Sequence, residues 1–305
     1  MRIVFMGSPD FAIPSLEALH NSEHDILAVV SNVDKRRGRG GKRSPTPVKA
    51  RALELELPVI EVDRMDDPEF ENRLSALDAD LFVVVAFRVL PPALLSIPPK
   101  GCINLHASLL PRYRGAAPIH WAIMNGEKET GCTVFFLEEK VDTGGIILQK
   151  KTPIGENETT GDLYERLKIM GSRLLGEAVD QIAAGTYQVQ PQNDEEATPA
   201  PKLFTGDCKI DFEAPAREVH NKIRGLSPFP TAWGTLDGLK FQMYRSRIGP
   251  SDADLYPGQL GLEGESLLAG CKQGSVILET VQIEGKRKMS GKAFMNGYSG
   301  TGIIH

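Results

Sequence analysis

Short apolar runs alternate with amphipathic segments over the first part of the chain. The apolar runs, rich in β-branched side chains, lie at 2–6, 25–31, 81–86 and 102–105. Segments whose apolar side chains recur with helical spacing lie at 11–19, 48–55, 69–77 and 116–124. Strands that alternate with helices in this way predict βαβ units and a mostly parallel sheet, so the predicted fold class is α/β.

The pattern changes beyond this region. Two further strand-like runs, 133–137 and 146–151, are joined by the sequence EEKVDTGG, which predicts a strand pair with a connecting loop. Residues 159–182 then carry apolar side chains at helical spacing, and the pattern ends near Gly185, a residue type that favours helix termini. We expect one long amphipathic helix there.

A polar, proline-rich segment divides the chain. Residues 188–201 hold three prolines, an acidic run and almost no large apolar side chains, a composition typical of a linker. One helical segment (214–224) follows, and then short strand-like runs separated by glycine turns, which predict a small β-barrel or sandwich. We therefore predict a first domain over residues 1–187, a linker over 188–205 and a second domain over 206–305.

The composition resembles that of an ordinary globular protein and excludes several classes. Hydrophobic residues make up 41% and charged residues 25% of the 305-residue chain, enough for a sizeable core. The four cysteines show neither CxxC pairing nor zinc-ligand spacing, which argues against a disulfide scaffold or a zinc ribbon and fits a reducing cytoplasm. No apolar run approaches the roughly 18 residues of a membrane span, and the opening MRIVFMG is too short for a signal peptide. We expect a cytoplasmic protein with no membrane partner.

One strongly basic segment stands out against a net charge of −5. Residues 34–49, DKRRGRGGKRSPTPVK, contain seven basic side chains and one acidic side chain, and their glycines oppose a stable helix, so we expect a mobile loop. Such a loop can bind phosphates and become ordered on binding, although a solvated surface loop would carry the same charges. The candidate nucleic-acid contacts are Lys35, Arg36, Arg37, Arg39, Lys42 and Arg43.

The most informative stretch is 101–115, GCINLHASLLPRYRG. If 102–105 is a strand, Asn104 and His106 are two residues apart and project from the same face at its carboxyl end. Acyl transfer to an amine needs a donor for the developing oxyanion and a group that handles the amine's proton, and a carboxamide beside an imidazole supplies both. The same residues also fit a turn cap and a histidine bonded to backbone.

A carboxylate completes the candidate site. Asp142 lies in the loop between the two later strands and is followed by Thr-Gly-Gly, so the backbone there can approach other segments closely. At a neighbouring strand end it would orient His106 and raise the basicity of the imidazole. An Asp in such a turn also commonly forms an Asx-turn, and both interpretations stand at this point.

Several motifs together carry a family resemblance. The sequences GSPDFAIPSL, NLHASLLPRYRGAAPIHWAI, VDTGGIIL and IRGLSPFPTAW, with the basic Gly/Arg segment, make the chain resemble the methionyl-tRNA formyltransferases almost end to end. The resemblance implies a Rossmann-like catalytic domain followed by an OB-like β-barrel that binds tRNA. It also implies transfer of a formyl group from 10-formyltetrahydrofolate to the α-amino group of methionine on initiator tRNA.

The resemblance assigns roles to individual positions. Asn104, His106 and Asp142 match the catalytic asparagine, histidine and aspartate, and no metal is implied. Arg88 stands where glycine is more usual. The folate-binding positions that it implies are Phe87, Arg88, Val89 and Leu90 in one loop, and Ser108, Leu109, Leu110 and Pro111 in another.

The resemblance leaves alternatives open. Relatives with the same chemistry act on amino-sugar nucleotides or on water, and a non-catalytic RNA-binding protein could use the same fold. The basic segment 34–49 favours tRNA, as do Lys286, Arg287, Lys288 and Lys292 in the second domain. We expect a monomer that works in a cytoplasm of bacterial type, with initiator Met-tRNA as its partner.

Overall fold

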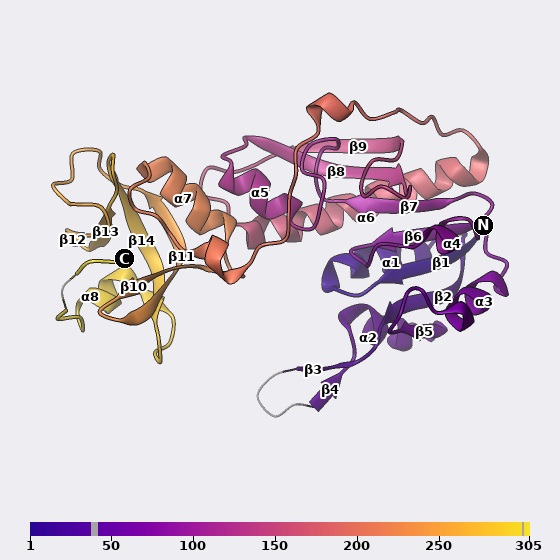
Figure 1. Ribbon diagram of the computed structural model, residues 1–305, viewed down its shortest axis with the longest axis horizontal. Helices are drawn as coiled ribbons and strands as arrows, with labels where there is room; N and C mark the ends of the chain where they lie inside the picture. The colour runs from indigo at the N-terminus through magenta and orange to yellow at the C-terminus, as the bar shows by residue number, and fades with distance from the viewer. Residues whose placement is uncertain (38–41, 301) are drawn as a thin grey trace. The chain divides into compact units, whose positions relative to one another are not determined.

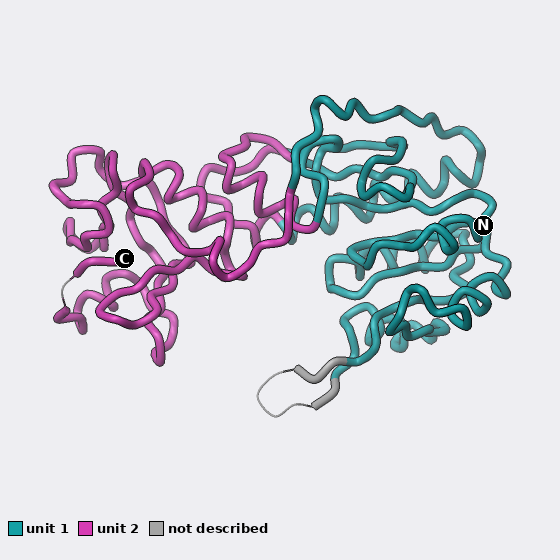
Figure 2. Tube along the Cα trace, viewed as in Figure 1, with its two compact units in different colours: residues 1–115, 131–152, 164–199 teal, residues 116–130, 153–163, 200–305 magenta. Residues whose placement is uncertain are grey.

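The computed structural model describes residues 1–37, 42–300 and 302–305, with the side chains of 35–37, 42 and 43 excepted. The chain forms two compact units, coloured separately in Figure 2. Unit 1 comprises residues 1–115, 131–152 and 164–199. Unit 2 comprises residues 116–130, 153–163 and 200–305.

A seven-stranded sheet forms the centre of unit 1 (Figure 1). Its strands are β1 (Arg2–Gly7), β2 (Asp25–Asn32), β5 (Val59–Val62), β6 (Leu81–Val85), β7 (Cys102–His106), β8 (Glu129–Phe136) and β9 (Ile146–Pro153). They are ordered β5-β2-β1-β6-β7-β8-β9. The strands from β5 to β7 pair in parallel, whereas β8 runs antiparallel to β7. The predicted mostly parallel α/β sheet is confirmed.

Helices follow these strands, most of them where the apolar periodicity predicted a helix. They are α1 (Ile13–His20), α2 (Pro47–Glu54), α3 (Pro68–Ser75), α4 (Pro92–Leu95) and the long α6 (Thr160–Ala184), whose first residues belong to unit 2. The Thr46 hydroxyl caps α2 by accepting the Lys49 N–H at 3.1 Å, and Asp67 caps α3 in the same way. Every residue of β6 is buried, which explains its uninterrupted apolar run.

Where the sequence led us to expect a mobile loop, the described part of the basic segment contains a pair of short strands. β3 (Lys35–Arg37) pairs antiparallel with β4 (Lys42–Ser44), with Lys35 opposite Ser44. The two flanks of the segment are held together, because the Ser31 and Thr46 hydroxyls are 2.6 Å apart. Because this contact brings the two ends of the segment together, the backbones that follow can pair as the strands of a hairpin. We call the paired strands β3 and β4, with the residues that join them in the sequence, the basic hairpin.

Unit 2 is built on a separate antiparallel sheet. Its strands are β10 (Ala232–Leu236), β11 (Leu239–Ile248), β12 (Leu260–Glu263), β13 (Ser266–Gly270), β14 (Ser275–Ile283) and β15 (Met289–Ser290). The order is β10-β11-β14-β13-β12, with β15 paired to β14. Its helices are α5 (Pro118–Met124), α7 (Ala216–Gly225) and α8 (Gly291–Met295).

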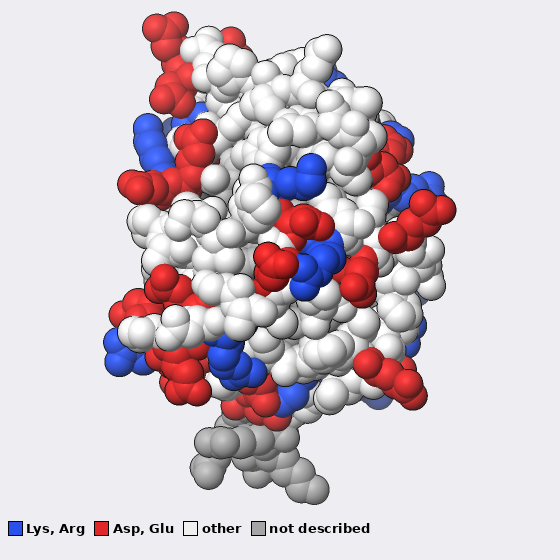
Figure 3. Space-filling model, turned by 90° about the vertical axis from the view of Figure 1, so that its right-hand side faces the viewer, with Lys and Arg blue, Asp and Glu red and all other residues white. Residues whose placement is uncertain are grey.

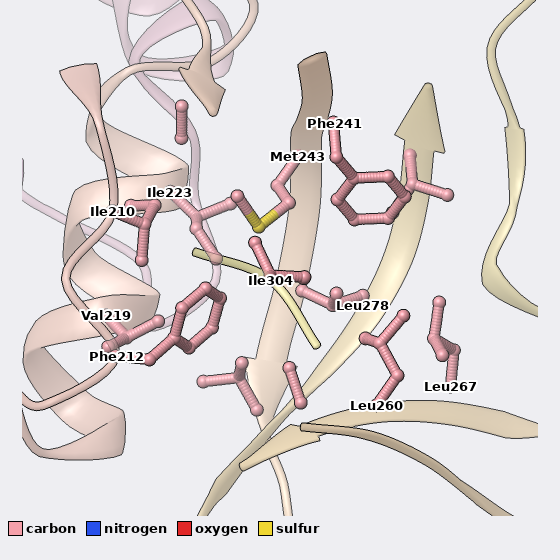
Figure 4. Packing of buried hydrophobic residues seen from close by; sticks show 14 of the residues in the cluster. Ile210, Phe212, Val219, Ile223, Phe241, Met243, Leu260, Leu267, Leu278 and Ile304 are labelled. Atoms are coloured by element: carbon pink, nitrogen blue, oxygen red, sulfur yellow. The ribbon is translucent and has the colours of Figure 1, made fainter. Parts of the chain in front are cut away.

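Residues 303–305 close this sheet into a small barrel. Ile304 bridges Leu236 at the end of β10, and the neighbouring Ile303 bridges Gln259 just before β12. The last residues thus lie between the two edge strands, so that neither edge is left unpaired there. Ile304 also points into the apolar core shared by β11, β14 and α7 (Figure 4). This is the small β-barrel that the sequence predicted.

The units divide the chain differently from the predicted boundaries of 1–187, 188–205 and 206–305. α5 falls in unit 2, where it packs on α7 so closely that a Cβ on Gly225 would lie 2.5 Å from Met124 Cγ. Residues 188–199 fall in unit 1. We call them the strap, because they are fastened to unit 1 by backbone pairing of Gln190 with Ile146 at 2.8 and 2.9 Å. No described helix is long and apolar enough to cross a membrane.

Candidate active site

The end of β7 presents the carboxamide and the imidazole together. Asn104 and His106 lie on the same face of this strand, opposite Phe135 and Thr133 of β8. His106 is buried, whereas Asn104 is the one residue of β7 that is partly exposed. Among the described residues the Asn104 side chain forms no hydrogen bond, so its amide is available to a ligand.

Two groups flank the His106 ring. Nε2 lies 2.9 Å from the Tyr113 carbonyl oxygen, and because a carbonyl only accepts, Nε2 carries the proton. Nδ1 then faces Asp142, with 3.8 Å between Nδ1 and Oδ2. That separation exceeds a hydrogen bond but is well within electrostatic range. In the tautomer that carries its proton on Nε2, the ring presents the Nδ1 lone pair on the side of Asp142.

Asp142 is held in an unusual conformation. Its φ of 56° lies in the left-handed region, and its Oδ2 accepts the Gly115 N–H at 2.8 Å. A Cβ on Gly144 would lie only 1.8 Å from the Phe136 carbonyl oxygen, so this turn requires glycine. The carboxylate bonds to a segment 27 residues away. The structure thus favours the site carboxylate over the local Asx-turn.

The strap supplies a residue that the sequence did not single out. The Gln192 side chain donates to the Asp142 carbonyl oxygen at 3.0 Å and to the Gly144 carbonyl oxygen at 2.8 Å. Its own oxygen accepts from the Arg114 guanidinium at 2.8 and 3.1 Å. A lone glutamine in a polar, proline-rich segment gives no local signal for this role, because all of these partners are distant in sequence.

The loop after β7 is fixed by polar contacts to the antiparallel strands. The Thr133 hydroxyl donates to the Ser108 carbonyl oxygen at 2.7 Å and accepts the Leu110 N–H at 3.1 Å. The Ser108 hydroxyl donates to the Arg112 carbonyl oxygen at 2.7 Å. Ser108 and Leu110 are therefore buried, whereas Leu109 and Pro111 are partly exposed. The peptide bond between Leu110 and Pro111 is cis.

The loop after β6 divides its four candidate residues between interior and surface. Leu90 is buried in the core, Phe87 packs against the same core, and the Val89 side chain is 64% exposed. The Arg88 guanidinium donates to the carbonyl oxygens of Val62 and Asp63 at the end of β5. Its side chain thus ties the loop to the sheet.

A surface hollow lies beside α4, and none of the residues that the resemblance assigns to the folate lines it. Its volume is about 550 Å³, within the usual range for small-molecule sites. It lies between α4 and the segment that leaves β8, and it is lined by Pro92, Leu95, Ser96, Leu137, Glu138, Glu139 and Lys140. The described residues include no group of three or more His, Cys, Asp or Glu side chains that could hold a metal.

The basic hairpin rests on an ion-paired base. Lys49 Nζ lies 2.8 Å from both Asp34 Oδ1 and Glu61 Oε1, and these hydrogen bonds raise the pKa of Lys49. Arg39 lies outside the described residues, as do the side chains of Lys35, Arg36, Arg37, Lys42 and Arg43. On the face drawn in Figure 3, basic and acidic side chains are interspersed, and neither sign covers a continuous area.

Comparison with known proteins identifies the family. Residues 1–179 match the formyl transferase family, and residues 202–299 match the formyl transferase C-terminal domain. A methionyl-tRNA formyltransferase from Pelotomaculum thermopropionicum is 42% identical over 97% of this chain and 96% of its own length. One from Moorella thermoacetica is 45% identical over 98% and 96%. The chain belongs to the methionyl-tRNA formyltransferase family.

Solved structures share the fold of this methionyl-tRNA formyltransferase family member at lower identity. An N-formyltransferase from Helicobacter canadensis, in complex with folinic acid and dTDP-3-aminofucose, has a TM-score of 0.68 and 22% identity over 90% of this chain and 98% of its own. HypX from Aquifex aeolicus, in complex with tetrahydrofolic acid, has a TM-score of 0.68 and 17% identity over 100% and 50%. Glycinamide ribonucleotide transformylase 1 from Symbiobacterium toebii has a TM-score of 0.53 and 25% identity over 63% and 94%.

Proposed function

We propose that this protein transfers the formyl group of 10-formyltetrahydrofolate to the α-amino group of methionine on initiator tRNA. The observation that carries the proposal is the match to methionyl-tRNA formyltransferases at 42–45% identity across both domains. The sugar N-formyltransferase shares only 22%. A non-catalytic RNA-binding protein would need neither the buried His106 nor a carboxylate held 3.8 Å from its ring.

Three side chains share the work of the transfer. As the methionyl nitrogen bonds to the formyl carbon, negative charge develops on the formyl oxygen, and this charge is lost when the carbonyl re-forms and the bond to N10 breaks. Asn104 would stabilise that oxygen by donating a hydrogen bond, and so would His106 once its Nδ1 has accepted the proton of the methionyl nitrogen. Asp142 would stabilise the imidazolium and assist the proton that leaves the methionyl nitrogen for N10. Positioning of the reactants along β7 is worth several kcal/mol, on the order of 5, if the site is preorganised.

The folate is proposed to bind beside the loop after β6. When bound, 10-formyltetrahydrofolate supplies the activated one-carbon group. In that loop the exposed Val89 side chain offers apolar surface to a flat ring system. Because Ser108, Leu110 and Leu90 are buried, they would act through their backbone groups and their packing. The ring of Phe87 would act through its packing. Arg88, Leu109 and Pro111 would shape the walls.

The tRNA is proposed to bind the basic hairpin through Lys35, Arg36, Arg37, Arg39, Lys42 and Arg43. Phosphate contacts by these basic side chains would hold the acceptor stem while chemistry proceeds at β7. The OB-like domain, residues 206–305, would add contacts to the tRNA backbone. These contacts would come from Lys286, Arg287, Lys288 and Lys292. We propose a monomer that works in a cytoplasm of bacterial type.

A single assay separates the proposed function from its alternatives. The purified protein is incubated with 10-formyltetrahydrofolate, and tetrahydrofolate release is followed with and without charged initiator tRNA. We expect release only with Met-tRNA, in step with the appearance of formyl-Met-tRNA. Release with water alone would indicate a hydrolase, and release with an amino-sugar nucleotide would indicate a sugar formyltransferase. No release under any condition would indicate a binding protein.

A further inference from the structure

The Gln192 amide in the strap has all four of its hydrogen-bonding positions occupied. Both hydrogens of Nε2 are donated, to the carbonyl oxygens of Asp142 and Gly144. Both lone pairs of Oε1 are occupied by the guanidinium of Arg114. A guanidinium only donates and a carbonyl only accepts, so this arrangement fixes the orientation of the amide.

These bonds close a ring around the candidate catalytic pair. Starting from the Asp142 carboxylate, the ring runs through the Gly115 N–H, along the backbone to Arg114, across to Gln192, and back to the Asp142 carbonyl oxygen. The residue before Arg114 supplies the carbonyl that binds His106 Nε2. One amide therefore connects the backbone that holds the imidazole to the backbone that holds the carboxylate.

We infer that Gln192 is a positioning residue for the proposed formyl transfer: it sets the distance between Asp142 and His106 and touches neither substrate. The left-handed backbone of Asp142 is strained for a residue with a Cβ, so this conformation needs outside support. Two of the carbonyls of its turn receive that support from Gln192. Displacement of a catalytic group by about 1 Å can cost on the order of 100-fold in rate.

The strap has further contacts to unit 1, which allow an effect of Gln192 on positioning to be told apart from an effect on stability. Arg114 also pairs with Asp194 at 2.8 Å, and its backbone N–H donates to the Thr198 carbonyl oxygen at 2.9 Å. Gln190 pairs with Ile146 through its backbone alone, and its side chain is exposed. None of these bonds involves the Gln192 side chain, so the strap has anchors that are independent of it.

The test uses the full chain with two substitutions at Gln192 and one control. Gln192→Glu keeps an acceptor for Arg114 but turns a carboxylate oxygen toward two carbonyls, and Gln192→Leu removes both halves of the amide. Gln190→Ala is the matched control in the same strap. We expect both Gln192 variants to lower kcat by about 10- to 100-fold. KM for Met-tRNA and the dissociation constant of 5-formyltetrahydrofolate should stay within about threefold, and Gln190→Ala should behave as the unaltered protein.

Repeating the Gln192 substitution in a second protein variant tests the positioning role specifically. In an Asp142→Asn protein, Gln192→Leu should lower kcat by less than about threefold, because the carboxylate that Gln192 positions has already been neutralised. A general structural role would instead give a full additional loss in that background. It would also weaken folate binding and lower the unfolding midpoint in parallel with kcat.

The outcomes distinguish this inference from the proposed function on which it rests. If the unaltered protein makes no formyl-Met-tRNA, the proposed function fails and the inference fails with it. If the unaltered protein formylates and the Gln192 variants match Gln190→Ala, the inference alone is overturned. If Gln192→Leu does not fold, Gln192→Glu still decides, with folding checked by circular dichroism.

Discussion

Two buried histidines, one in each unit, have similar surroundings at first sight. His106 ends β7 and His220 lies on α7, and their exposed fractions are 8% and 0%. In each ring Nε2 is bonded to a backbone carbonyl oxygen, that of Tyr113 at 2.9 Å and that of Glu156 at 3.1 Å. The difference is at the other nitrogen. His220 Nδ1 is bonded to the Ser246 hydroxyl at 2.9 Å, whereas His106 Nδ1 faces a carboxylate 3.8 Å away.

The comparison shows that burial and hydrogen bonding alone do not mark a catalytic histidine. His220 is bonded at both nitrogens and joins α7 to β11 and to the loop before α6, so its role is structural. Burial lowers the pKa of His220, which keeps the ring neutral. His106 keeps one nitrogen for chemistry, next to a carboxylate that would stabilise the charged ring. That spare nitrogen at a strand end is the feature that indicates catalysis.

The largest expected effect is the difference in kcat between variants of the two histidines. His106→Ala should lower kcat for Met-tRNA formylation by about 1,000-fold, roughly 4 kcal/mol of barrier, because general acid–base and oxyanion contributions disappear together. His220→Ala should stay within about threefold at a temperature where it is folded. Steady-state assays with Met-tRNA above its KM measure both. Similar losses in the two variants would remove the distinction.

The same two substitutions should affect the free energy of unfolding in the opposite order. His220→Ala should lower the free energy of unfolding by about 2–4 kcal/mol, because it creates a cavity and leaves a buried Ser246 hydroxyl without its partner. His106→Ala should cost about 1 kcal/mol, since its ring is bonded at only one nitrogen. Urea unfolding followed by circular dichroism gives both values. A larger cost at His106 would contradict the assignment.

The structural role of His220 should also appear in how the stability of the protein depends on pH. Burial lowers the pKa of His220 in the folded protein, and neighbouring Arg224 and Arg217 act in the same direction, although the Glu156 carbonyl opposes them. The unfolded chain then binds more protons than the folded protein in the acid range. Stability from His220 is therefore full above the unfolded pKa of about 6.5 and is lost as the pH falls below it. Between pH 7.5 and 5, the unaltered protein should lose more stability than His220→Gln does.

The smallest expected effect concerns capture of the substrate. Replacing Arg36, Arg37 and Arg39 of the basic hairpin with glutamine should raise KM for Met-tRNA by about three- to tenfold and leave kcat nearly unchanged. The salt dependence of binding should flatten by about 0.7–0.9 per lost phosphate contact. Rates measured at several potassium chloride concentrations test this. Unchanged kinetics would show that the hairpin does not bind tRNA.

Sequence patterns predicted those parts of the molecule that depend on local order. The run at β6 reads as a strand because all its residues are buried, and the two-residue spacing of Asn104 and His106 gives them one face on any strand. The short β5, Val59–Val62, was missed because Glu61 interrupts its apolar run. The long Arg88 side chain could have pointed either way from its loop, and only the structure shows that it bonds back to the sheet.

Long-range polar contacts escaped prediction for a physical reason. Gln192 acts through four hydrogen bonds to residues at least 48 positions away, and no periodicity or composition encodes such partners. The strap was predicted to be a linker because it has few apolar side chains. It is nevertheless fastened, since backbone pairing and amide hydrogen bonds need no apolar surface.

The proposed formyl transfer depends most on Asp142 acting through His106. A double-mutant cycle in single-turnover formylation, with His106→Ala, Asp142→Asn and the double variant at saturating Met-tRNA and 10-formyltetrahydrofolate, measures that dependence directly. We predict that Asp142→Asn alone slows transfer by about 100-fold but slows the His106→Ala protein by less than about fivefold. If the two losses simply multiply, the carboxylate and the imidazole act independently and the central claim is contradicted.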